Sequence, residues 1–377
     1  MTLFNPLTLT QNLIRCPSVT PLDAGALDVV QQSLEQLGFT CHRLKFEDVD
    51  NLYARLGTAQ PNFCFAGHTD VVPVGDATAW QTNPFAAEIK GNILYGRGAA
   101  DMKAAIAAFI SATATFLENR KTFNGSISFL ITGDEEGIAI NGTKKVLEWL
   151  AEKGEKLDFC LVGEPTNPHF LGEMIKNGRR GSMNGYLTIH GKQGHAAYPE
   201  RAKNPIPLLL QALQNFLAQP LDSGTEFFQP SNLEITSVDV GNTVTNIIPA
   251  TAKAQFNIRF NTAHTSESLT AWLHEQVKKV TADYTLEIQV SGDAFLTPPC
   301  PEITLIQDAT EKVTGKRAVL STTGGTSDAR FIKNYCPVVE FGIVGATMHQ
   351  VNEAVYVEDI YLLTEIYNTV LSRYFAM

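Results

Sequence analysis

The sequence predicts an α/β protein with a mostly parallel sheet, interrupted by a second, inserted domain of the ferredoxin-like α+β type. Short apolar runs alternate with helical patterns in the first part of the chain. Near residue 181 the pattern changes to the order β-α-β-β-α-β, and α/β patterning returns after residue 292. A chain of 377 residues exceeds what one hydrophobic core usually serves, so two domains are expected.

The first part of the chain combines amphipathic helices with buried strands. Apolar residues at helical spacing predict helices over residues 26–37, 102–117 and 142–151. Short apolar runs bounded by turn residues predict strands over residues 63–66, 127–132 and 159–162. Strands that alternate with helices in this way are typical of a parallel sheet covered by helices.

The middle of the chain follows the ferredoxin-like order. The predicted elements are a strand over residues 184–189, a helix over 205–218, strands over 233–240 and 252–260, a helix over 266–280 and a strand over 285–290. A helix over residues 303–313 and a strand over 337–343 follow. We therefore predict one discontinuous domain made of residues 1–180 and 293–377, with residues 181–292 inserted as the second.

Composition and charge argue against several classes of function. The net charge of -10 at pH 7 disfavours nucleic-acid binding, because phosphate contacts need a basic surface. The most apolar segment, residues 104–117, is interrupted by hydroxyl side chains and is too short for a membrane span, and the N-terminus has no signal-peptide core. The six cysteines are widely spaced, as expected of reduced thiols. We expect a cytoplasmic protein without nucleic-acid or membrane partners.

Acidic residues and histidines follow the predicted strands, where open parallel sheets place their ligand sites. Three strands run directly into such residues, another carboxylate begins the apolar helix, and a histidine follows the late strand. In chain order they are His68, Asp70, Asp101, Glu135, Glu136, Glu164 and His349. Carboxylates gathered at one sheet edge repel one another unless a cation neutralises them, so the pattern predicts a metal site.

Mixed imidazole and carboxylate ligands suit catalytic zinc, and related first-row metals accept the same set. Five ligands are too many for one tetrahedral ion that also holds water, whereas two ions that share a carboxylate use all five. We therefore predict two Zn2+ per chain, with Co2+ an alternative at one site. His68 and Glu164 would hold one ion, Glu136 and His349 the other, and Asp101 would lie between them.

Three carboxylates have alternative interpretations. Glu135 precedes a predicted ligand and can point elsewhere, so we interpret it as the general base for water; otherwise it is a solvated turn residue. Asp70 could accept the second ring N–H of His68, or it could cap a turn. Asp101 could instead be a helix N-cap.

These motifs resemble the co-catalytic zinc aminoacylase and carboxypeptidase family of metallopeptidases, over almost the whole chain. The strings are Gly-His68-Thr-Asp70-Val-Val-Pro, Gly-Arg-Gly-Ala-Ala-Asp101-Met-Lys, Asp-Glu135-Glu136, Val-Gly-Glu164-Pro-Thr and the late His349. The resemblance implies an amide hydrolase with a zinc-binding catalytic domain, and a ferredoxin-like insertion through which two chains dimerise. It also implies that His195 reaches into the partner's active site and stabilises the oxyanion.

Finer strings at residues 177–182, 194–199, 246–249 and 324–331 resemble the desuccinylases of this family, whose substrate is N-succinyl-L,L-diaminopimelate. The resemblance implies a small anionic substrate, with guanidinium groups gripping its carboxylates. The implied substrate contacts are Lys176, Arg179, Ser182, Tyr198, Asn246, Arg259, Gly325 and Thr326. The sequence departs from the pattern at Gly345 and Gln350, where desuccinylases commonly carry Asn and Lys, which puts one substrate contact in doubt.

Two other functions remain open. One is a different member of the family, such as an acetylornithine deacetylase or a dipeptidase, with the same metals and another pocket. The other is a non-catalytic metal-binding or scaffold protein on the same fold. Retention of Glu135 beside a complete ligand set argues against the scaffold, because a degenerate binder has no need of a base. The glycine-rich segment 324–327 lacks the spacing and the lysine of a nucleotide-binding loop.

Overall fold

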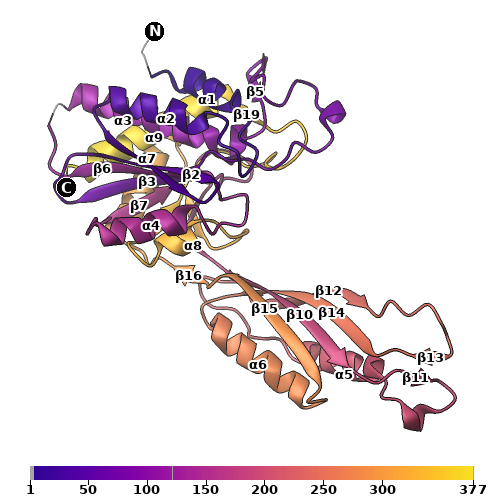
Figure 1. Cartoon of the computed structure of the whole chain (residues 1–377). Coiled ribbons are helices and arrows are strands. Elements are labelled where there is room, and N and C mark those ends of the chain that lie inside the picture. The colour runs from indigo at the N-terminus through magenta and orange to yellow at the C-terminus, as the bar shows by residue number, and fades with distance from the viewer. Residues whose placement is uncertain (1–3, 121, 377) are drawn as a thin grey trace. The chain divides into compact units, whose positions relative to one another are not determined.

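A computed structural model gives the structure of residues 4–120 and 122–376 (Figure 1). Internal contacts divide the chain into two compact units. Unit 1 comprises the described residues of 1–177, 297–321 and 327–377, and unit 2 comprises residues 178–296 and 322–326. Unit 1 is therefore built from both ends of the chain, and unit 2 from its middle together with one short later segment.

Unit 1 is built on an eight-stranded sheet in the order β1-β2-β6-β3-β7-β18-β8-β17. The strands are β1 (Thr40–Phe46), β2 (Val49–Leu56), β3 (Asn62–His68), β6 (Ser126–Thr132), β7 (Phe159–Val162), β8 (Met174–Lys176), β17 (Val319–Ser321) and β18 (Val338–Glu340). The central strand β3 pairs in parallel with both β6 and β7, and β7 pairs in parallel with β18. β1 and β2 add an antiparallel edge. This mixed, mostly parallel sheet confirms the predicted fold class.

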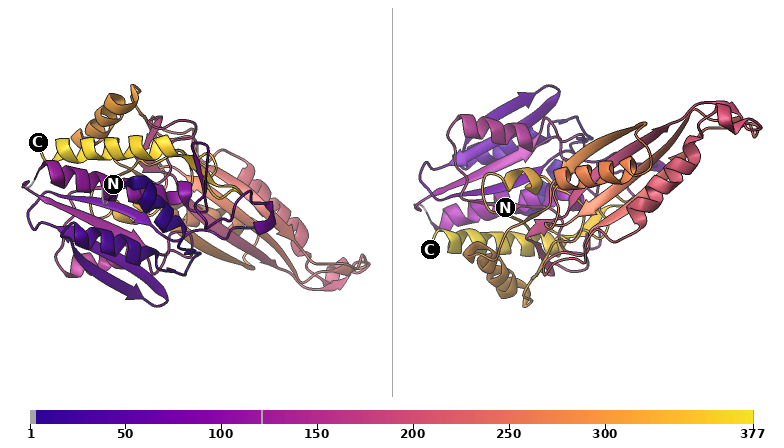
Figure 2. Two further views of the ribbon diagram at one scale, coloured as in Figure 1. Left: turned by 90° about the horizontal axis from the view of Figure 1, so that it is seen from above. Right: turned by 90° about the horizontal axis from the view of Figure 1, so that it is seen from below.

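Helices cover both faces of this sheet: α1, α3 and α9 pack together on one face, and α4 lies on the other (Figures 1 and 2). The helices of unit 1 are α1 (Pro6–Ile14), α2 (Ala26–Gln36), α3 (Ala104–Asn119), α4 (Thr143–Glu152), α7 (Pro301–Thr314), α8 (Ala329–Ile332) and α9 (Val357–Tyr374). Unit 1 also contains a separate three-stranded sheet, made of β4 (Ile89–Lys90), β5 (Ile93–Tyr95) and β19 (Ala354–Tyr356).

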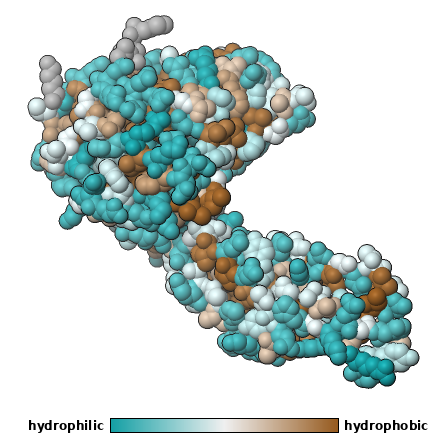
Figure 3. Space-filling view, viewed as in Figure 1, coloured by the Kyte–Doolittle hydropathy of each residue, from teal (hydrophilic) through white to brown (hydrophobic). Residues whose placement is uncertain are grey.

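Helix α3 lies in the centre of the unit 1 core. Phe109 of α3 stacks on Phe65 of β3 with ring centroids 4.4 Å apart, and Tyr367 of α9 packs edge-on against both rings. The segment Ala99–Asn119, which includes α3, is long and apolar enough for a membrane span, yet 89% of its apolar window is buried inside the protein. The apolar side chains of this segment therefore pack in the hydrophobic core. Most residues on the face seen in Figure 3 are hydrophilic.

Unit 2 has the predicted order β-α-β-β-α-β. The elements that follow this order are β10 (Gly181–His190), α5 (Pro205–Leu217), β12 (Asn232–Asp239), β14 (Thr251–Phe260), α6 (Ser266–Lys278) and β15 (Tyr284–Gly292). The antiparallel sheet has the order β12-β14-β10-β15, and α5 and α6 pack on it around Leu187, Phe256 and Leu273. Along β10 every second residue is buried, as expected of a sheet with one covered face.

Several elements of unit 1 were not predicted. They include the helices α1, α8 and α9, the β1–β2 hairpin, the strands β8 and β17, and the three-stranded sheet of β4, β5 and β19. The late strand, predicted over residues 337–343, is limited to Val338–Glu340. The predicted helix over residues 102–117 begins two residues later, because a separate π-helical turn, η2 (Ala99–Lys103), precedes α3 and carries Asp101.

Candidate active site

His68 is the last residue of β3, at the carboxyl end of the parallel strands where such sheets place their ligands. Nδ1 of His68 lies 2.9 Å from the backbone carbonyl oxygen of Asp70, to which the ring N–H donates. That contact leaves Nε2 to face the carboxylates, 3.1 Å from Oδ1 of Asp101 and 3.7 Å from Oε1 of Glu164. The His68 ring is therefore oriented as a metal ligand whose second nitrogen is held by the protein.

A second group forms around His349, which lies in the loop after β18. Its Nε2 is 2.8 Å from Oε1 of Glu136 and 3.3 Å from Oδ2 of Asp101. Asp101 thus presents one carboxylate oxygen to His68 and the other to His349. This arrangement brings together all five residues predicted as metal ligands.

The donor atoms fit two cations that share one carboxylate. The atoms of His68, Asp101 and Glu164 all lie within 4.8 Å of one another, and so do those of Asp101, Glu136 and His349. Two imidazoles and three carboxylates are ligands that zinc accepts. The residues present therefore fit a pair of metal ions.

Crowded acids and bases set the electrostatics of this site. Burial raises the pKa of Glu164 well above its usual range, and the charge of Asp101 adds to this effect. Burial opposes ionisation of Asp101 too, but hydrogen bonds from His349 and His68 hold the pKa of Asp101 well below its usual range. Hydrogen bonds to Asp101 and Glu136 raise the pKa of His349 to about 10. The two imidazoles and three carboxylates therefore perturb one another strongly, as expected of donors crowded into one site.

Asp101 does not cap the helix that follows it. It lies inside η2 with φ -123° and ψ 92°, which are not helical angles. The N-cap position of α3 is Lys103, which makes no side-chain capping bond. The N-cap interpretation of Asp101 is therefore wrong, and its carboxylate faces the two histidines instead.

Asp70 has a different contact from the one predicted. Its carboxylate accepts hydrogen bonds from the backbone N–H groups of Glu135 and Glu136, at 3.2 and 3.0 Å. The ring N–H of His68 donates to the Asp70 main-chain carbonyl, and the carboxylate Oδ1 is 3.6 Å from Nδ1. Asp70 is 1% exposed, and burial raises its pKa to about 6. Its carboxylate therefore fixes the turn that carries both glutamates, while its backbone orients His68.

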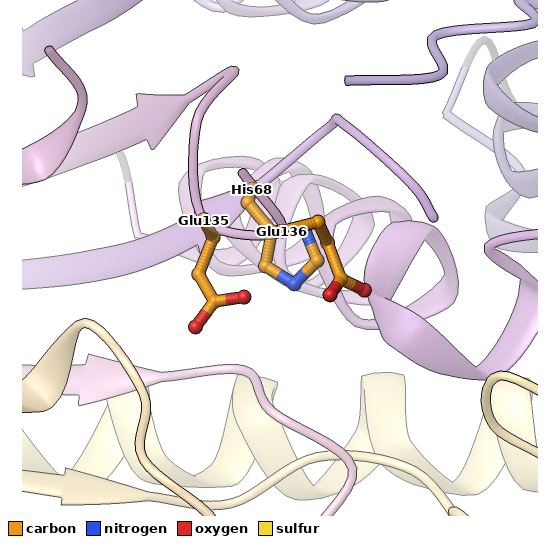
Figure 4. Close-up of side chains that lie close together, drawn as sticks. All are labelled: His68, Glu135 and Glu136. Atoms are coloured by element: carbon orange, nitrogen blue, oxygen red, sulfur yellow. The ribbon is translucent and has the colours of Figure 1, made fainter. Parts of the chain in front are cut away.

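Glu135 and Glu136 are neighbours whose carboxylates lie on either side of the His68 ring (Figure 4). The ligand atoms of His68, Glu135 and Glu136 also lie within 4.8 Å of one another, so Glu135 is close enough to act on a water held between the ligands. Burial raises the pKa of Glu135 well above its usual range, although His68 opposes the shift. A carboxylate with a raised pKa is a better proton acceptor, as a general base requires.

The predicted substrate contacts fall into three places. Lys176 lies in β8 of unit 1, with Nζ 3.3 Å from Oγ of Ser321. In unit 2, Ser182 of β10 lies opposite Arg259 in the register of the neighbouring antiparallel strand β14. Nη1 of Arg179 donates to the carbonyl of Thr323 at 3.2 Å. This contact brings Arg179 beside the loop that contains Gly325 and Thr326.

The other unit 2 residues gather where β11 (Gly194–His195) pairs with β13 (Ile247–Ile248). His195, Tyr198 and Asn246 are all exposed there, and the carbonyl of Asn246 accepts the N–H of Ala196 at 2.8 Å. Nδ1 of His195 accepts the N–H of Ala197 at 3.0 Å, which places the proton of a neutral ring on Nε2. His195 is therefore an exposed hydrogen-bond donor.

The departure at residue 345 has a local structural reason. A Cβ atom on Gly345 would lie 3.0 Å from both Cβ and the carbonyl oxygen of Pro165, which directly follows Glu164. A side chain at this position therefore needs a shift of the segment next to a predicted ligand. Gln350, at the other departure, donates its side-chain N–H to the carbonyl of Ala346 at 3.1 Å.

Two buried charged residues beside the site were not predicted. Arg97 is 2% exposed and Glu353 is fully buried. Each lies four positions from a predicted ligand, Arg97 before Asp101 and Glu353 after His349. Their closeness in sequence to a predicted ligand was the one sign that they belong to the site, because the burial of a charged residue cannot be read from its local sequence.

Comparison with known proteins identifies the family of this chain. Residues 64–373 match the family described as Peptidase family M20/M25/M40. A succinyl-diaminopimelate desuccinylase of Maricaulis maris is 62% identical over 377 residues, which cover 99% of this chain and 96% of the relative.

Solved structures share the fold at low sequence identity. An M20 family metallo-carboxypeptidase, Sso-CP2 from Sulfolobus solfataricus, superposes with a TM-score of 0.79 at 18% identity, covering 99% of this chain and 100% of that one. The Bacillus subtilis YXEP protein, described as a dinuclear metal binding peptidase, gives 0.70 at 17% identity with 98% of each chain covered. The family match and the near-full-length relative therefore establish that this chain belongs to peptidase family M20/M25/M40.

Proposed function

We propose that this enzyme hydrolyses N-succinyl-L,L-2,6-diaminopimelate to succinate and L,L-2,6-diaminopimelate, a precursor of lysine and peptidoglycan. The observation that carries the proposal is the 62% identity, over 99% of the chain, to a succinyl-diaminopimelate desuccinylase. A second such relative, from Rhodospirillum centenum, is 60% identical over 99% of the chain. These relatives favour a succinyl amide over the acetyl and dipeptide substrates of the alternative family members.

The metal centre that we propose holds two Zn2+ per chain, with Co2+ an alternative at one position. His68 and Glu164 would hold the first ion, Glu136 and His349 the second, and Asp101 would contact both. The two groups of ligand atoms and a dinuclear metal-binding protein of the same fold support this arrangement. When bound, the metals supply Lewis-acid polarisation of the amide carbonyl and increase the acidity of the attacking water.

Glu135 performs the proton transfers in this scheme. It takes a proton from the attacking water and returns it to the nitrogen of the leaving amine. The turn that carries Glu135 is held through its own N–H by the buried Asp70 carboxylate, which limits how far the base can move. The raised pKa of Glu135 supports a role as proton acceptor and then as proton donor.

The chain acts as a homodimer in our proposal, and His195 of one subunit completes the site of the other. The exposed His195 side chain, with Nδ1 occupied by the N–H of Ala197, offers its Nε2–H to an external oxyanion. Arg179 and Arg259 would bind carboxylates of the substrate. The reaction would take place in the cytoplasm, which agrees with six free cysteines, all within the described part of the chain.

A substrate panel tests the function directly. Purified, metal-loaded protein should turn over N-succinyl-L,L-diaminopimelate with a kcat/KM orders of magnitude above that for N-acetylornithine or dipeptides. A preference for one of the other two substrates would contradict the desuccinylase assignment and leave the metal hydrolase assignment intact.

A further inference from the structure

A buried ion pair joins the two segments that carry Asp101 and His349. Nη1 of Arg97 lies 2.7 Å from Oε2 of Glu353, and the two side chains are 2% and 1% exposed. Arg97 precedes η2, whereas Glu353 follows the His349 loop, directly before β19. Neither residue belongs to the groups of ligand atoms, so the pair lies behind the metal ligands rather than among them.

Glu353 holds the backbone of the Asp101 turn. Its Oε2 accepts the N–H of Gly98 at 3.1 Å, and its Oε1 accepts the N–H groups of Ala100 at 2.9 Å and of Asp101 itself at 3.1 Å. Hydrogen bonds to an ionised carboxylate are stronger than those between neutral groups. The backbone from which the Asp101 side chain projects is therefore fixed by one buried carboxylate.

Arg97 contacts the other segment. Its Nη1 donates to the carbonyl of Gln350 at 3.3 Å, and its Nη2 donates to the carbonyls of His349 at 3.5 Å and Pro73 at 3.2 Å. The ring of Trp80 packs against the guanidinium, with its centroid 5.3 Å from Cζ. His349 has a φ of 62°, in the left-handed region that residues with a Cβ rarely adopt unless surrounding contacts enforce it. The hydrogen bonds that Arg97 donates to the carbonyls of His349 and Gln350 help to enforce this backbone conformation.

The ligands differ in how far they depend on this pair. His68 ends a strand that is paired on both sides, Glu164 follows β7, and Asp70 holds the backbone of Glu136. His349 lies in a loop without regular structure, and its side chain is 50% exposed. Loss of the Arg97–Glu353 pair should therefore affect the Asp101–Glu136–His349 position more than the His68–Asp101–Glu164 position.

We propose that Arg97 and Glu353 are a positioning pair that sets the place of His349 relative to Asp101 and so builds the Asp101–Glu136–His349 metal position. This inference rests on the proposed two-metal function. The pair acts through the backbone of the ligands and touches neither the substrate nor the reacting atoms. Glu353→Gln leaves the Arg97 charge buried without its counterion. Arg97→Lys keeps the charge but loses the planar guanidinium that donates to the carbonyls of His349 and Gln350, so both changes should disturb the site.

The test is a titration of chelator-treated protein with Zn2+, in which calorimetry measures the affinity of each binding step. Glu353→Gln and Arg97→Lys should bind one ion about 10- to 100-fold more weakly than the wild type does, the range typical of partners that orient metal ligands. The other ion should show a smaller loss of affinity, because Asp101 belongs to both groups of ligands. Glu155→Gln is the matched control. It breaks the Arg55–Glu155 ion pair of the same unit, which lies near the start of β6, at the opposite end from Glu136, and should leave both steps unchanged.

Equal affinities in the wild type and both variants would overturn the positioning role, and so would equal weakening of both binding steps. The wild-type titration separates this inference from the function on which it rests. If the wild type binds fewer than two ions, the two-metal proposal itself fails, whatever the variants do.

A measurement on the wild type keeps the inference testable if the variants do not fold. The N–H groups of Gly98, Ala100 and Asp101 donate to Glu353, so hydrogen exchange should find them protected in chelator-treated protein before metal is added. Rapid exchange that slows only when metal is added would show that the ions, and not the ion pair, build the turn. That result would overturn the proposal.

Discussion

Nε2 of His349 lies 2.8 Å from Oε1 of Glu136, although 213 positions separate the two residues along the chain. The His349 loop follows β18, and Glu136 follows β6, on the other side of the central strands β3 and β7 in the sheet order. Asp101 lies 3.3 Å from the same imidazole nitrogen. Three segments that are distant in sequence therefore supply one group of ligands, and the consequences can be tested one residue at a time.

Chelation should abolish turnover, because the proposed reaction depends on cations held by two imidazoles and three carboxylates. Activity should return when Zn2+ or Co2+ is added, and elemental analysis should approach two ions per chain. His349→Ala should lower the metal content toward one ion per chain, because it removes a ligand from one group only. Full activity of the metal-free protein would contradict the mechanism.

Glu135→Gln should retain near-normal metal content and lose turnover by roughly a hundredfold or more, as expected when a positioned general base is removed. Gln keeps the size of the side chain but cannot take the proton. Glu136→Gln is the matched comparison, since it alters a proposed ligand one position away and should lose metal. If Glu135→Gln loses metal and Glu136→Gln does not, the two roles are exchanged.

Mixing two inactive variants tests whether the site is shared between subunits. His195→Ala chains and Glu135→Gln chains should each be inactive, but a mixed dimer contains one site with both residues intact. Partial recovery of turnover is expected once subunit exchange has been verified by mass spectrometry of differently tagged chains. Exchange without recovery would place His195 outside the partner's site.

Arg179→Ala should remove most of the preference for succinyl over acetyl substrates. Loss of one partner from a buried charged hydrogen-bonded pair costs about 2 to 5 kcal/mol, so kcat/KM for the succinyl substrate should fall at least thirtyfold. Arg317→Ala is a suitable control, because Arg317 forms solvent-exposed ion pairs with Asp308 and Glu311 of α7. An unchanged substrate ratio in Arg179→Ala would exclude this guanidinium from substrate recognition.

Metal binding should release protons near pH 7. Hydrogen bonds to Asp101 and Glu136 raise the pKa of His349 to about 10, so the metal-free imidazole is protonated at neutral pH and must lose that proton to bind a cation. Because protons compete with metal, the affinity should fall as the pH falls. Calorimetry in two buffers with different ionisation enthalpies gives the number of protons released. A value of zero would show that His349 does not exchange its proton for a metal ion.

The sequence by itself determined the fold class and predicted which side chains gather at the sheet edge. Hydrophobic periodicity depends only on neighbouring residues, and β7 lies over the residues predicted for it, Phe159–Val162. The carboxylates and histidines that follow these strands meet at one sheet edge because parallel strands share their direction. The order of elements in unit 2 could be predicted for the same local reason.

Only the tertiary structure decided how the ligands are held. The carboxylate of Asp70 binds the Glu135–Glu136 turn, and a Cβ atom on Gly345 would lie 3.0 Å from Pro165. The Arg97–Glu353 pair connects positions 256 residues apart. The physical reason is that each of these contacts depends on burial and on partners brought close by the packed sheet. A charged residue has the same local sequence whether folding exposes it or encloses it with its counterion.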